Sequence, residues 1–304
     1  MDYQAALDVF FAAPPVGVAV PDPVAGASPA RRLRDALEPV AMHGVWSPGT
    51  NAALAEHGYN FLTGYVTGRA APLGDVPSSV VAATFGVFEP GLVDALWTEG
   101  RGLLPLAELI AVRDRATTAS LRGVLADADE TEVARVADLL ERAVADLDGT
   151  GRVLFSALRS QPRLDDPFAR LWRTADLVRE HRGDGHVAAS IAAGLDPVRM
   201  GILMEVWLGY PIGEYSGTRA WPQEVQDAAV ARLEADGLLL GGAITEAGRT
   251  TRDAIEAATD RTQDALVGAL GADLAGVTAA LENWSQQCVD AKTFPPDVRK
   301  RAAG

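Results

Sequence analysis

One segment in the last third of this chain constrains the fold more than any other. Residues 222–236 have the composition of a helix, and Gly237 directly after them is a typical helix stop. Two short apolar runs then flank the pair Gly241-Gly242, a pattern that predicts two short strands around a turn. Thr245 follows with a side-chain oxygen that can satisfy the free amides of a new helix. The segment therefore predicts a helix, a very short hairpin and a second helix in direct succession.

The rest of the sequence predicts helices. Ser28-Pro29 and Ser47-Pro48 each join an N-cap serine to a proline that suits the first helical position. Over residues 131–147 the apolar side chains recur every three or four positions, as on the buried face of a helix. We therefore expect a mainly α fold, with an N-terminal helical domain over residues 1–150 and a second domain over residues 151–304.

Glycines and prolines predict where several of these helices end. A linker rich in Pro, Gly and Ala is expected over residues 14–27. Helices are expected over residues 167–181 and 185–193, with a flexible connection between them. The helix that begins at Thr245 is expected to run to about Leu270, before a last helix over residues 272–291.

The helix–hairpin–helix segment resembles a known family. Two stretches are similar to the recognition helix, wing and following helix of MarR-family transcriptional regulators: Arg232-Leu233-Glu234-Ala235-Asp236-Gly237-Leu238 and Ile244-Thr245-Glu246-Ala247-Gly248-Arg249. The resemblance implies a winged helix. In that fold the recognition helix enters the major groove of DNA, and the wing carries basic residues to the minor groove.

The charges of this segment depart from the MarR pattern. The predicted recognition helix has Arg232 against four carboxylates, those of Glu224, Asp227, Glu234 and Asp236. The wing, residues 240–243, has no charge. Carboxylates repel the phosphates of DNA, whereas DNA-binding surfaces normally present Lys and Arg. We therefore expect a degenerate winged helix that no longer binds DNA; the alternative is a MarR-like regulator that senses a ligand and binds DNA.

A second resemblance covers nearly the whole chain. Five stretches are similar to those of an uncharacterised bacterial family described simply as helix-turn-helix proteins: His43, Tyr65–Gly74, Gly185–Ala189, Arg219-Ala220-Trp221 and Glu256–Arg261. The resemblance implies no established chemistry. It does imply a histidine before the proline of the step Phe88-Glu89-Pro90, where this chain has Glu89.

The amino-acid composition limits the classes of binding partner and the cellular compartment that we expect. The 304 residues include 27 Lys and Arg against 41 Asp and Glu, a formal net charge of −14, which disfavours nucleic acid and anionic membranes as partners. No apolar run approaches the roughly 20 residues that span a bilayer, and the N-terminus lacks the basic start of a signal peptide. The single cysteine, Cys288, excludes an internal disulfide. We expect a cytoplasmic protein without a membrane partner.

Three residues are candidates for catalysis. His43 and His186 each lie in an apolar stretch, and the two imidazoles could reach a shared cleft together with Glu89 if the two halves of the chain pack face to face. Such a set suits general acid–base chemistry near neutral pH or a metal or haem contact. The alternative is that each histidine is a hydrogen-bonded core or cap residue, because no metal-binding spacing links them. The sequence specifies no metal or cofactor.

Four further residues are candidates for ligand binding. Tyr65 and Arg69 are four residues apart and share a helical face, and a guanidinium at this position could bind a carboxylate or phosphate. Arg219 and Trp221 could form a cation–π or aromatic wall for a ligand. The structural alternatives are that Arg69 ties a helix end to a loop, and that Arg219 pairs with Glu256 or Asp260 beside a buried Trp221.

Together these observations predict a small-molecule-binding protein or an enzyme, with its pocket between the two halves of the chain. The pocket is expected to hold His43, Tyr65, Arg69, Glu89 and His186. A third possibility is a purely structural partner that forms a homodimer through the last two helices. The sequence specifies neither the ligand nor the reaction.

Overall fold

The computed structural model describes residues 2–12 and 27–302, so the linker expected over residues 14–27 lies, except for Ala27, outside the described residues. The described chain is mainly α, as the sequence predicts. Its N-terminal half contains α1 (Tyr3–Phe10), α2 (Pro29–Ala41), α3 (His43–Trp46), α4 (Pro48–Ala55), α5 (Phe61–Ala70), the 3-10 turn η1 (Ala71–Leu73), α6 (Ser78–Phe85), α7 (Pro90–Gly100), α8 (Leu106–Val124) and α9 (Glu130–Ala145).

The second half is also helical apart from one hairpin. It contains α10 (Val153–Arg159), α11 (Pro167–Ala192), α12 (Pro197–Trp207), η2 (Ser216–Arg219), α13 (Gln223–Ala235), β1 (Leu239–Leu240), β2 (Ala243–Ile244), α14 (Glu246–Arg261), α15 (Asp264–Leu270), η3 (Gly271–Asp273), α16 (Leu274–Asp290) and α17 (Val298–Ala302).

The hairpin forms where the sequence predicts it. Leu239 pairs with Ile244, and Leu240 with Ala243, in an antiparallel ladder of two residues per strand. Gly241 and Gly242 form the turn with φ angles of 57° and 75°, which other residues adopt only at a cost. The hydroxyl of Thr245 accepts a hydrogen bond from the Gly248 amide and thereby caps α14.

Two expected helix ends are wrong. The structure has one continuous helix, α11, where a break was expected at residues 182–185. Gly185 serves close packing there, because a side chain at this position would come within 2.7 Å of the Thr262 hydroxyl. The helix that Thr245 caps ends at Arg261 instead of running to Leu270. Thr262 turns its hydroxyl back to the Thr259 carbonyl, and the chain restarts as α15.

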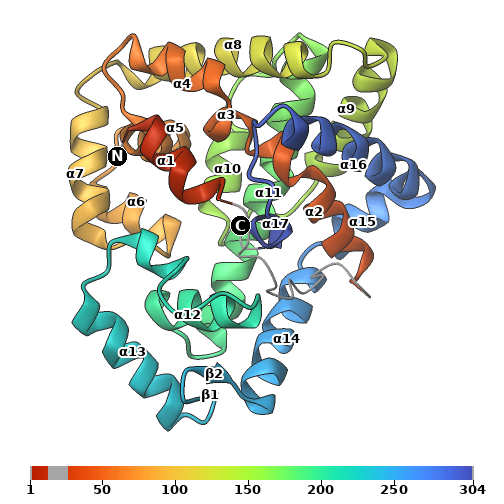
Figure 1. The fold of residues 1–304 in the computed structure, drawn as a ribbon. Helices are drawn as coiled ribbons and strands as arrows, with labels where there is room; N and C mark the ends of the chain where they lie inside the picture. Colours follow the sequence, from red (N-terminus) through yellow and green to blue (C-terminus); the bar gives the residue numbers. More distant parts are fainter. Residues whose placement is uncertain (1, 13–26, 303–304) are drawn as a thin grey trace.

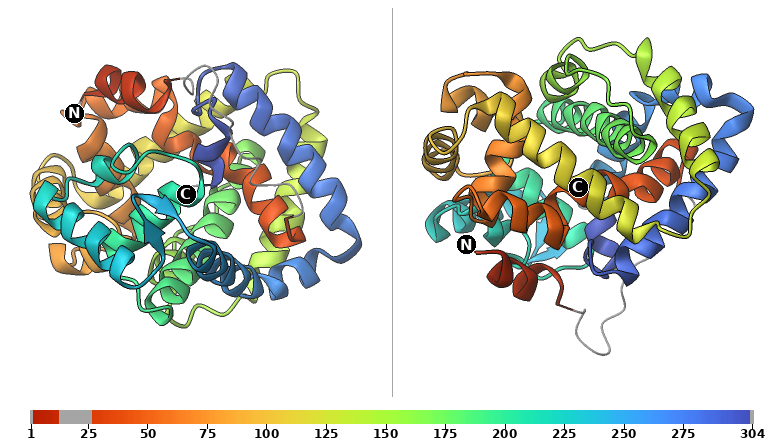
Figure 2. Two further views of the ribbon diagram at one scale, coloured as in Figure 1. Left: turned by 60° about the horizontal axis from the view of Figure 1, so that its bottom comes forward. Right: turned by 90° about the horizontal axis from the view of Figure 1, so that it is seen from above.

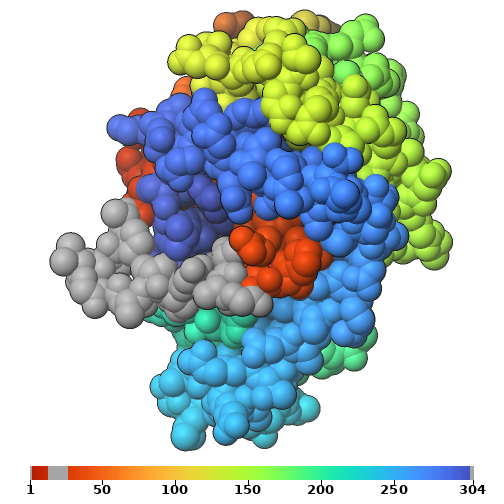
Figure 3. Space-filling view, turned by 90° about the vertical axis from the view of Figure 1, so that its right-hand side faces the viewer, coloured from red at the N-terminus to blue at the C-terminus, as the bar shows by residue number. Residues whose placement is uncertain are grey.

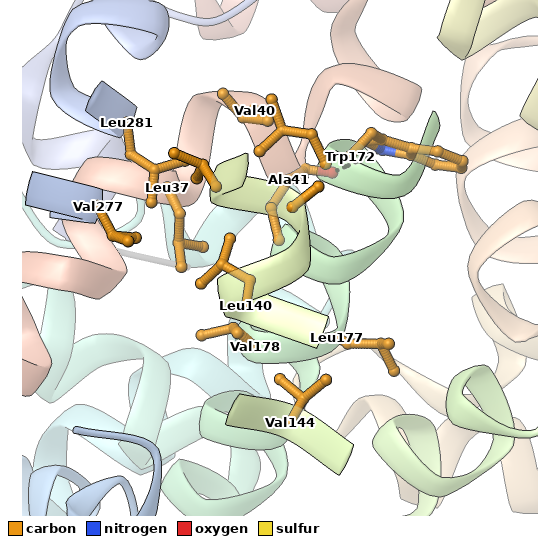
Figure 4. Packing of buried hydrophobic residues seen from close by; sticks show 14 of the residues in the cluster. Leu37, Val40, Ala41, Leu140, Val144, Trp172, Leu177, Val178, Val277 and Leu281 are labelled. Carbon is orange, nitrogen blue, oxygen red and sulfur yellow. Dashed lines mark hydrogen bonds between the residues drawn. The ribbon is translucent and has the colours of Figure 1, made fainter. Parts of the chain in front are cut away.

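The largest apolar cluster joins helices from both ends of the chain. Its side chains project toward one another from α2, α9, α11 and α16, as Figure 4 shows for Leu37, Leu140, Val178 and Leu281. Trp172 of α11 completes the cluster and donates its indole N–H to the Ala41 carbonyl at 3.1 Å. The cluster crosses the boundary expected near residue 150, so the residues on either side of it pack together; the division into two domains stays a prediction.

The helix–hairpin–helix unit lies at one end of the molecule. Figure 1 shows α12, α13, the hairpin and α14 below the other helices, and α11 extending from the centre toward them. α8 crosses the opposite end, as the view from above in Figure 2 shows. On the face drawn in Figure 3, α15 and α16 cover much of the surface, and α2 (orange-red) is visible only as a patch between the C-terminal helices.

One stretch of the described chain has the length and apolar character of a membrane-spanning helix. It is Asp264–Asp290, with a mean hydropathy of 1.4 over its most apolar window. The 3-10 turn η3 interrupts it, and Leu266, Val277 and Leu281 on one face belong to the central apolar cluster. A second stretch is long and apolar enough to span a membrane only if α11 and α12 are taken together as one span. The axes of these two helices are bent by 105° relative to each other.

Candidate functional site

A cavity of about 190 Å³ lies where α5, α6, α11, α12, η2 and the C-terminal segment meet. It is larger than the roughly 150 Å³ that accommodates benzene in an engineered apolar cavity. Aromatic and methionine side chains are prominent in its wall: Phe10, Met42, Trp46, Phe61, Phe85, Phe88, Met200, Met204, Tyr215, Trp221 and Phe294. The space is therefore suited to an apolar group of about the size of an aromatic ring.

The aromatic side chains of the wall pack against one another. The rings of Trp46 and Phe61 are stacked with centroids 5.2 Å apart, and Phe10 lies at the same distance from Trp46. Phe85 and Phe88 form a second group with Tyr65, at centroid distances of 5.9 to 6.4 Å. Because each ring is held by its neighbours, the cavity is built from rigid surfaces.

Four arginines of the wall are bound to buried carboxylates; we call Arg69, Arg179, Arg182 and Arg252 the paired arginines. Glu180 of α11 receives two hydrogen bonds from Arg69, at 2.7 and 2.8 Å, and one from Arg179 at 2.7 Å. Burial alone would raise the pKa of Glu180, but the two guanidinium groups outweigh this effect and lower the pKa to about 2. Arg179 also lies 3.4 Å from Glu38 and 3.8 Å from Asp176, so both arginines at this end of the wall have carboxylate partners within the protein.

Carboxylates of α14 bind the other two paired arginines: Glu256 binds both, and Asp260 lies 3.2 Å from Arg182. Glu256 of α14 accepts hydrogen bonds from Arg182 at 2.7 Å and from Arg252, and Arg31 of α2 also pairs with it. Burial would raise the pKa of Glu256, but these three guanidinium groups hold it well below its usual value. This cluster joins α2, α11 and α14 beneath the cavity, which is a structural role.

Two cations of the wall are held differently; we call Arg219 and Lys300 the stacked cations. The Arg219 guanidinium lies 4.6 Å from the ring centres of both Phe88 and Tyr215. The Lys300 ammonium lies 5.2 Å from the same Tyr215 ring and 5.4 Å from the ring of Phe10. Within residues 2–12 and 27–302, neither group has a carboxylate at ion-pair distance. Burial lowers the pKa of Lys300, because it disfavours the charged ammonium.

The backbone beside Arg219 is strained. Ala220 has a φ of 63° and ψ of 18°, in the left-handed region that costs a residue with a Cβ roughly 1–2 kcal/mol. Two long-range hydrogen bonds hold it there: the Trp221 indole donates to the Val87 carbonyl at 2.9 Å, and the Glu89 amide donates to the Arg219 carbonyl at 3.0 Å. The two hydrogen bonds maintain this strained backbone and so hold Arg219 and Trp221 at the cavity.

Glu205, which is not among the residues predicted from the sequence, orders the segment that carries Arg219. This carboxylate of α12 is fully buried and accepts hydrogen bonds from the amides of Gly213, Tyr215 and Ser216 and from the Ser216 hydroxyl. Four donors on one carboxylate fix the loop before η2. A single glutamate inside the apolar run Gly201–Leu208 was a signal that could have found it.

Five of the seven predicted site residues line the cavity: Tyr65, Arg69, His186, Arg219 and Trp221. Tyr65 accepts a 3.5 Å hydrogen bond from Arg69. The Nδ1 atom of His186 lies 3.0 Å from the Thr259 hydroxyl. Burial, with the nearby Arg252, lowers the pKa of His186 to about 3, so that its imidazole is neutral at physiological pH. The expected pairing of Arg219 with Glu256 or Asp260 is wrong, since those carboxylates bind Arg182 and its neighbours.

His43 and Glu89 do not line this cavity. His43 is fully buried in the core, with Nε2 at 2.9 Å from the Ser120 hydroxyl and Nδ1 at 3.8 Å from Cys288 Sγ. Burial lowers the pKa of His43 to about 3 and raises that of Cys288 to about 12, so both are neutral. Glu89 caps α7 through the amides of Gly91 and Leu92. The described residues contain no group of three His, Cys, Asp or Glu side chains placed to hold a metal.

Fold and site together define a class: mainly α proteins in which a helix–hairpin–helix unit and an N-terminal layer of helices enclose a cavity with aromatic walls and cationic groups. A family model described as a helix-turn-helix family matches residues 30–295. Because this match covers most of the chain, the protein belongs to that helix-turn-helix family. No curated protein and no solved structure matches the chain.

Proposed function

We propose that this protein binds a small molecule in the cavity, on a scaffold of winged-helix type that no longer binds DNA. The observation that carries the proposal is the cavity itself, which has a volume of about 190 Å³ and a largely apolar wall with many aromatic and methionine side chains. Ligand sites are typically concave and largely apolar, with a few polar groups that orient the ligand. Tyr65, His186 and Trp221 are such groups, and they belong to the residues predicted from the sequence.

The proposed ligand has an aromatic or compact aliphatic body. The mutual packing of Trp46 with Phe61, and of Phe85 with Phe88, gives the cavity preformed surfaces, which reduces the entropy lost on binding. His186 is neutral and has a hydrogen-bond partner, so we propose that it orients the ligand through its ring and does not act as a general acid near pH 7.

Calorimetric titration with indole, a neutral aromatic probe, tests the proposal. We expect wild-type protein to bind one equivalent of indole. Val187→Trp replaces a small aliphatic side chain of the cavity wall by a bulky ring, and it should abolish binding. The matched control is Val80→Trp at an exposed position outside the cavity, and it should bind indole like the wild type. Equal binding by both variants, or none by the wild type, would contradict the proposal.

A second candidate function is DNA binding, and membership of a helix-turn-helix family is the observation that favours it. The charges of α13 argue against it. Glu224, Asp227 and Glu234 are exposed on this helix, and the one arginine, Arg232, is 3.2 Å from Asp236. A helix that enters a DNA groove meets phosphates, which these carboxylates repel.

An electrophoretic shift assay with fragments of the source genome at low salt separates the two functions. We expect no shift, with or without a cavity ligand. A shift that weakens steeply as salt is added, and that is lost when Arg232 is replaced by Gln, would establish DNA binding by α13 and overturn the proposed loss.

A further inference from the structure

We propose that the cavity ligand is a small organic anion, and that the stacked cations Arg219 and Lys300 bind its carboxylate or an equivalent anionic group. This inference rests on the proposed function, because it assigns a chemical class to the ligand of the same cavity. It concerns the end of the cavity formed by η2 and α17, at which the aromatic rings of Phe88, Tyr215 and Phe10 lie against the two cations.

The cavity is a positively charged site in an acidic protein. Its lining side chains include six Lys and Arg residues against three carboxylates, Glu38, Asp184 and Glu256, whereas the whole chain has a formal net charge of −14. This local excess of positive charge attracts anions and repels organic cations. A neutral ligand would gain nothing from it.

The excess falls on the stacked cations. Each paired arginine has a carboxylate at ion-pair distance: Glu180 for Arg69, Glu256 for Arg252, Glu180, Glu38 and Asp176 for Arg179, and Glu256 and Asp260 for Arg182. The carboxylates of Asp297 and Glu214 raise the pKa of Lys300, against the lowering by burial. Asp297 is engaged with Arg299 at 2.8 Å, and Glu214 is exposed to solvent and makes no ion pair with Lys300 among the described residues. Arg219 and Lys300 thus retain donors for a ligand.

Both cations lie against the same aromatic ring and line the same cavity. The Arg219 guanidinium and the Lys300 ammonium lie 4.6 and 5.2 Å from the centre of the Tyr215 ring. Arg219 lowers the pKa of Lys300, so the two positive charges act on each other. A carboxylate between them would relieve this repulsion, with the guanidinium supplying parallel donors and the ammonium a point charge. The aromatic wall would hold the body of the same molecule.

The test compares phenylacetate with phenylacetamide, two probes of nearly the same shape of which only the first is charged. Isothermal titration at low salt should show that wild-type protein binds phenylacetate at least tenfold more tightly than phenylacetamide. Arg219→Gln and Lys300→Gln should each reduce this preference to threefold or less, with the amide bound as by the wild type. Arg232→Gln, at an exposed position on α13, is the matched control and should keep the full preference.

The outcomes separate this inference from the proposed function. If wild-type protein binds both probes equally, the proposal that the ligand is an anion is wrong, but the proposal that the cavity binds a ligand is supported. If phenylacetate is preferred but neither substitution at Arg219 or Lys300 alters the preference, the assignment of the headgroup site is overturned. If neither probe nor indole binds, the proposed function itself fails. Lys300 lies on the half-exposed C-terminal segment, so its variant gives a result even where Arg219→Gln fails to fold.

Discussion

The paired arginines and the stacked cations line the same cavity but balance their charge in different ways. Arg69 and Arg179 share one buried carboxylate of α11, at 2.7 to 2.8 Å. Arg219 and Lys300 instead lie over aromatic rings and have no carboxylate at ion-pair distance within the described chain. Breaking a buried ion pair is costly because it leaves a charge without a partner, whereas a cation on a ring surface remains accessible to an anion.

The difference indicates which residues maintain the fold and which can bind a ligand. The paired arginines connect helices far apart in sequence, such as α2, α11 and α14. Arg219 of the stacked cations precedes a strained residue, Ala220, and Lys300 lies on the short helix α17. Strain at a cavity that the surrounding hydrogen bonds maintain is typical of functional sites.

The largest expected effect comes from removing the carboxylate that the paired arginines share. Glu180→Gln leaves Arg69 without its ion-pair partner and Arg179 with only Glu38 and Asp176, and it should lower the free energy of unfolding by about 3–5 kcal/mol. Urea denaturation at pH 7 measures the loss. Glu282→Gln, at an exposed position on α16, is the control and should stay within about 0.5 kcal/mol of the wild type. A loss below about 1 kcal/mol for Glu180→Gln would show that the paired arginines are not structural.

A pH-dependent effect is expected at Asp184, which also lines the cavity. Burial raises its pKa to about 6, compared with about 3.9 in an unfolded chain. The ionised carboxyl therefore costs stability above pH 6, and the cost disappears as the pH falls to about 4. Asp184→Asn can keep an oxygen for the Phe155 amide, and it should be more stable than the wild type at pH 8 by up to about 3 kcal/mol.

Urea unfolding of both proteins between pH 4 and pH 8 checks this linkage. The advantage of Asp184→Asn should shrink steadily as the pH is lowered and vanish near pH 4. An advantage that is the same at every pH would mean that the carboxyl has an ordinary pKa, and that the balance of charge in the cavity wall differs from the one described.

The stacked cations should contribute much less to stability. Arg219→Gln removes two cation–π contacts and, within residues 2–12 and 27–302, no ion pair, so the free energy of unfolding should fall by about 1–2 kcal/mol. Thermal or urea unfolding of Arg219→Gln and Glu180→Gln under the same conditions compares the two losses of stability directly. If Arg219→Gln is as damaging as Glu180→Gln, the distinction between the two groups of cations is wrong.

The smallest effect is expected at the strained residue. Ala220→Gly relieves the positive φ but adds freedom to the unfolded chain, so a net gain of about 0.5 kcal/mol is expected. Ala235→Gly at the end of α13 has no strain to relieve and should lose about 0.5–1 kcal/mol. Changes in the free energy of unfolding of opposite sign for the two variants would support strain at position 220. Equal losses of stability would argue against it.

Local signals predicted much of the fold. The N-cap serines, the stop at Gly237 and the cap at Thr245 act within a few residues, and each was found where the sequence predicted it. The errors arose where distant packing decides the local structure. Glycines in residues 182–185 look like a break, but Gly185 lets Thr262 approach α11 and the helix continues. No neighbouring residue in the sequence indicates that contact.

The site was predictable in part for the same reason. Tyr65, Arg69, His186, Arg219 and Trp221 stood out as polar or aromatic residues in distinctive motifs, and all line the cavity. Sequence alone could not separate the two groups of cations, because the carboxylate that binds an arginine can be distant in the sequence. Glu256, for example, is 225 positions from its partner Arg31. Nor could it show that His43 lies in the core beside Cys288.

The decisive experiment is a crystal structure of the protein grown with phenylacetate. We expect density for one molecule in the cavity, with its ring between the aromatic side chains and its carboxylate within hydrogen-bond distance, about 3 Å, of Arg219 or Lys300. An empty cavity at saturating phenylacetate, or a molecule bound with its carboxylate turned away from both cations, would contradict this expectation.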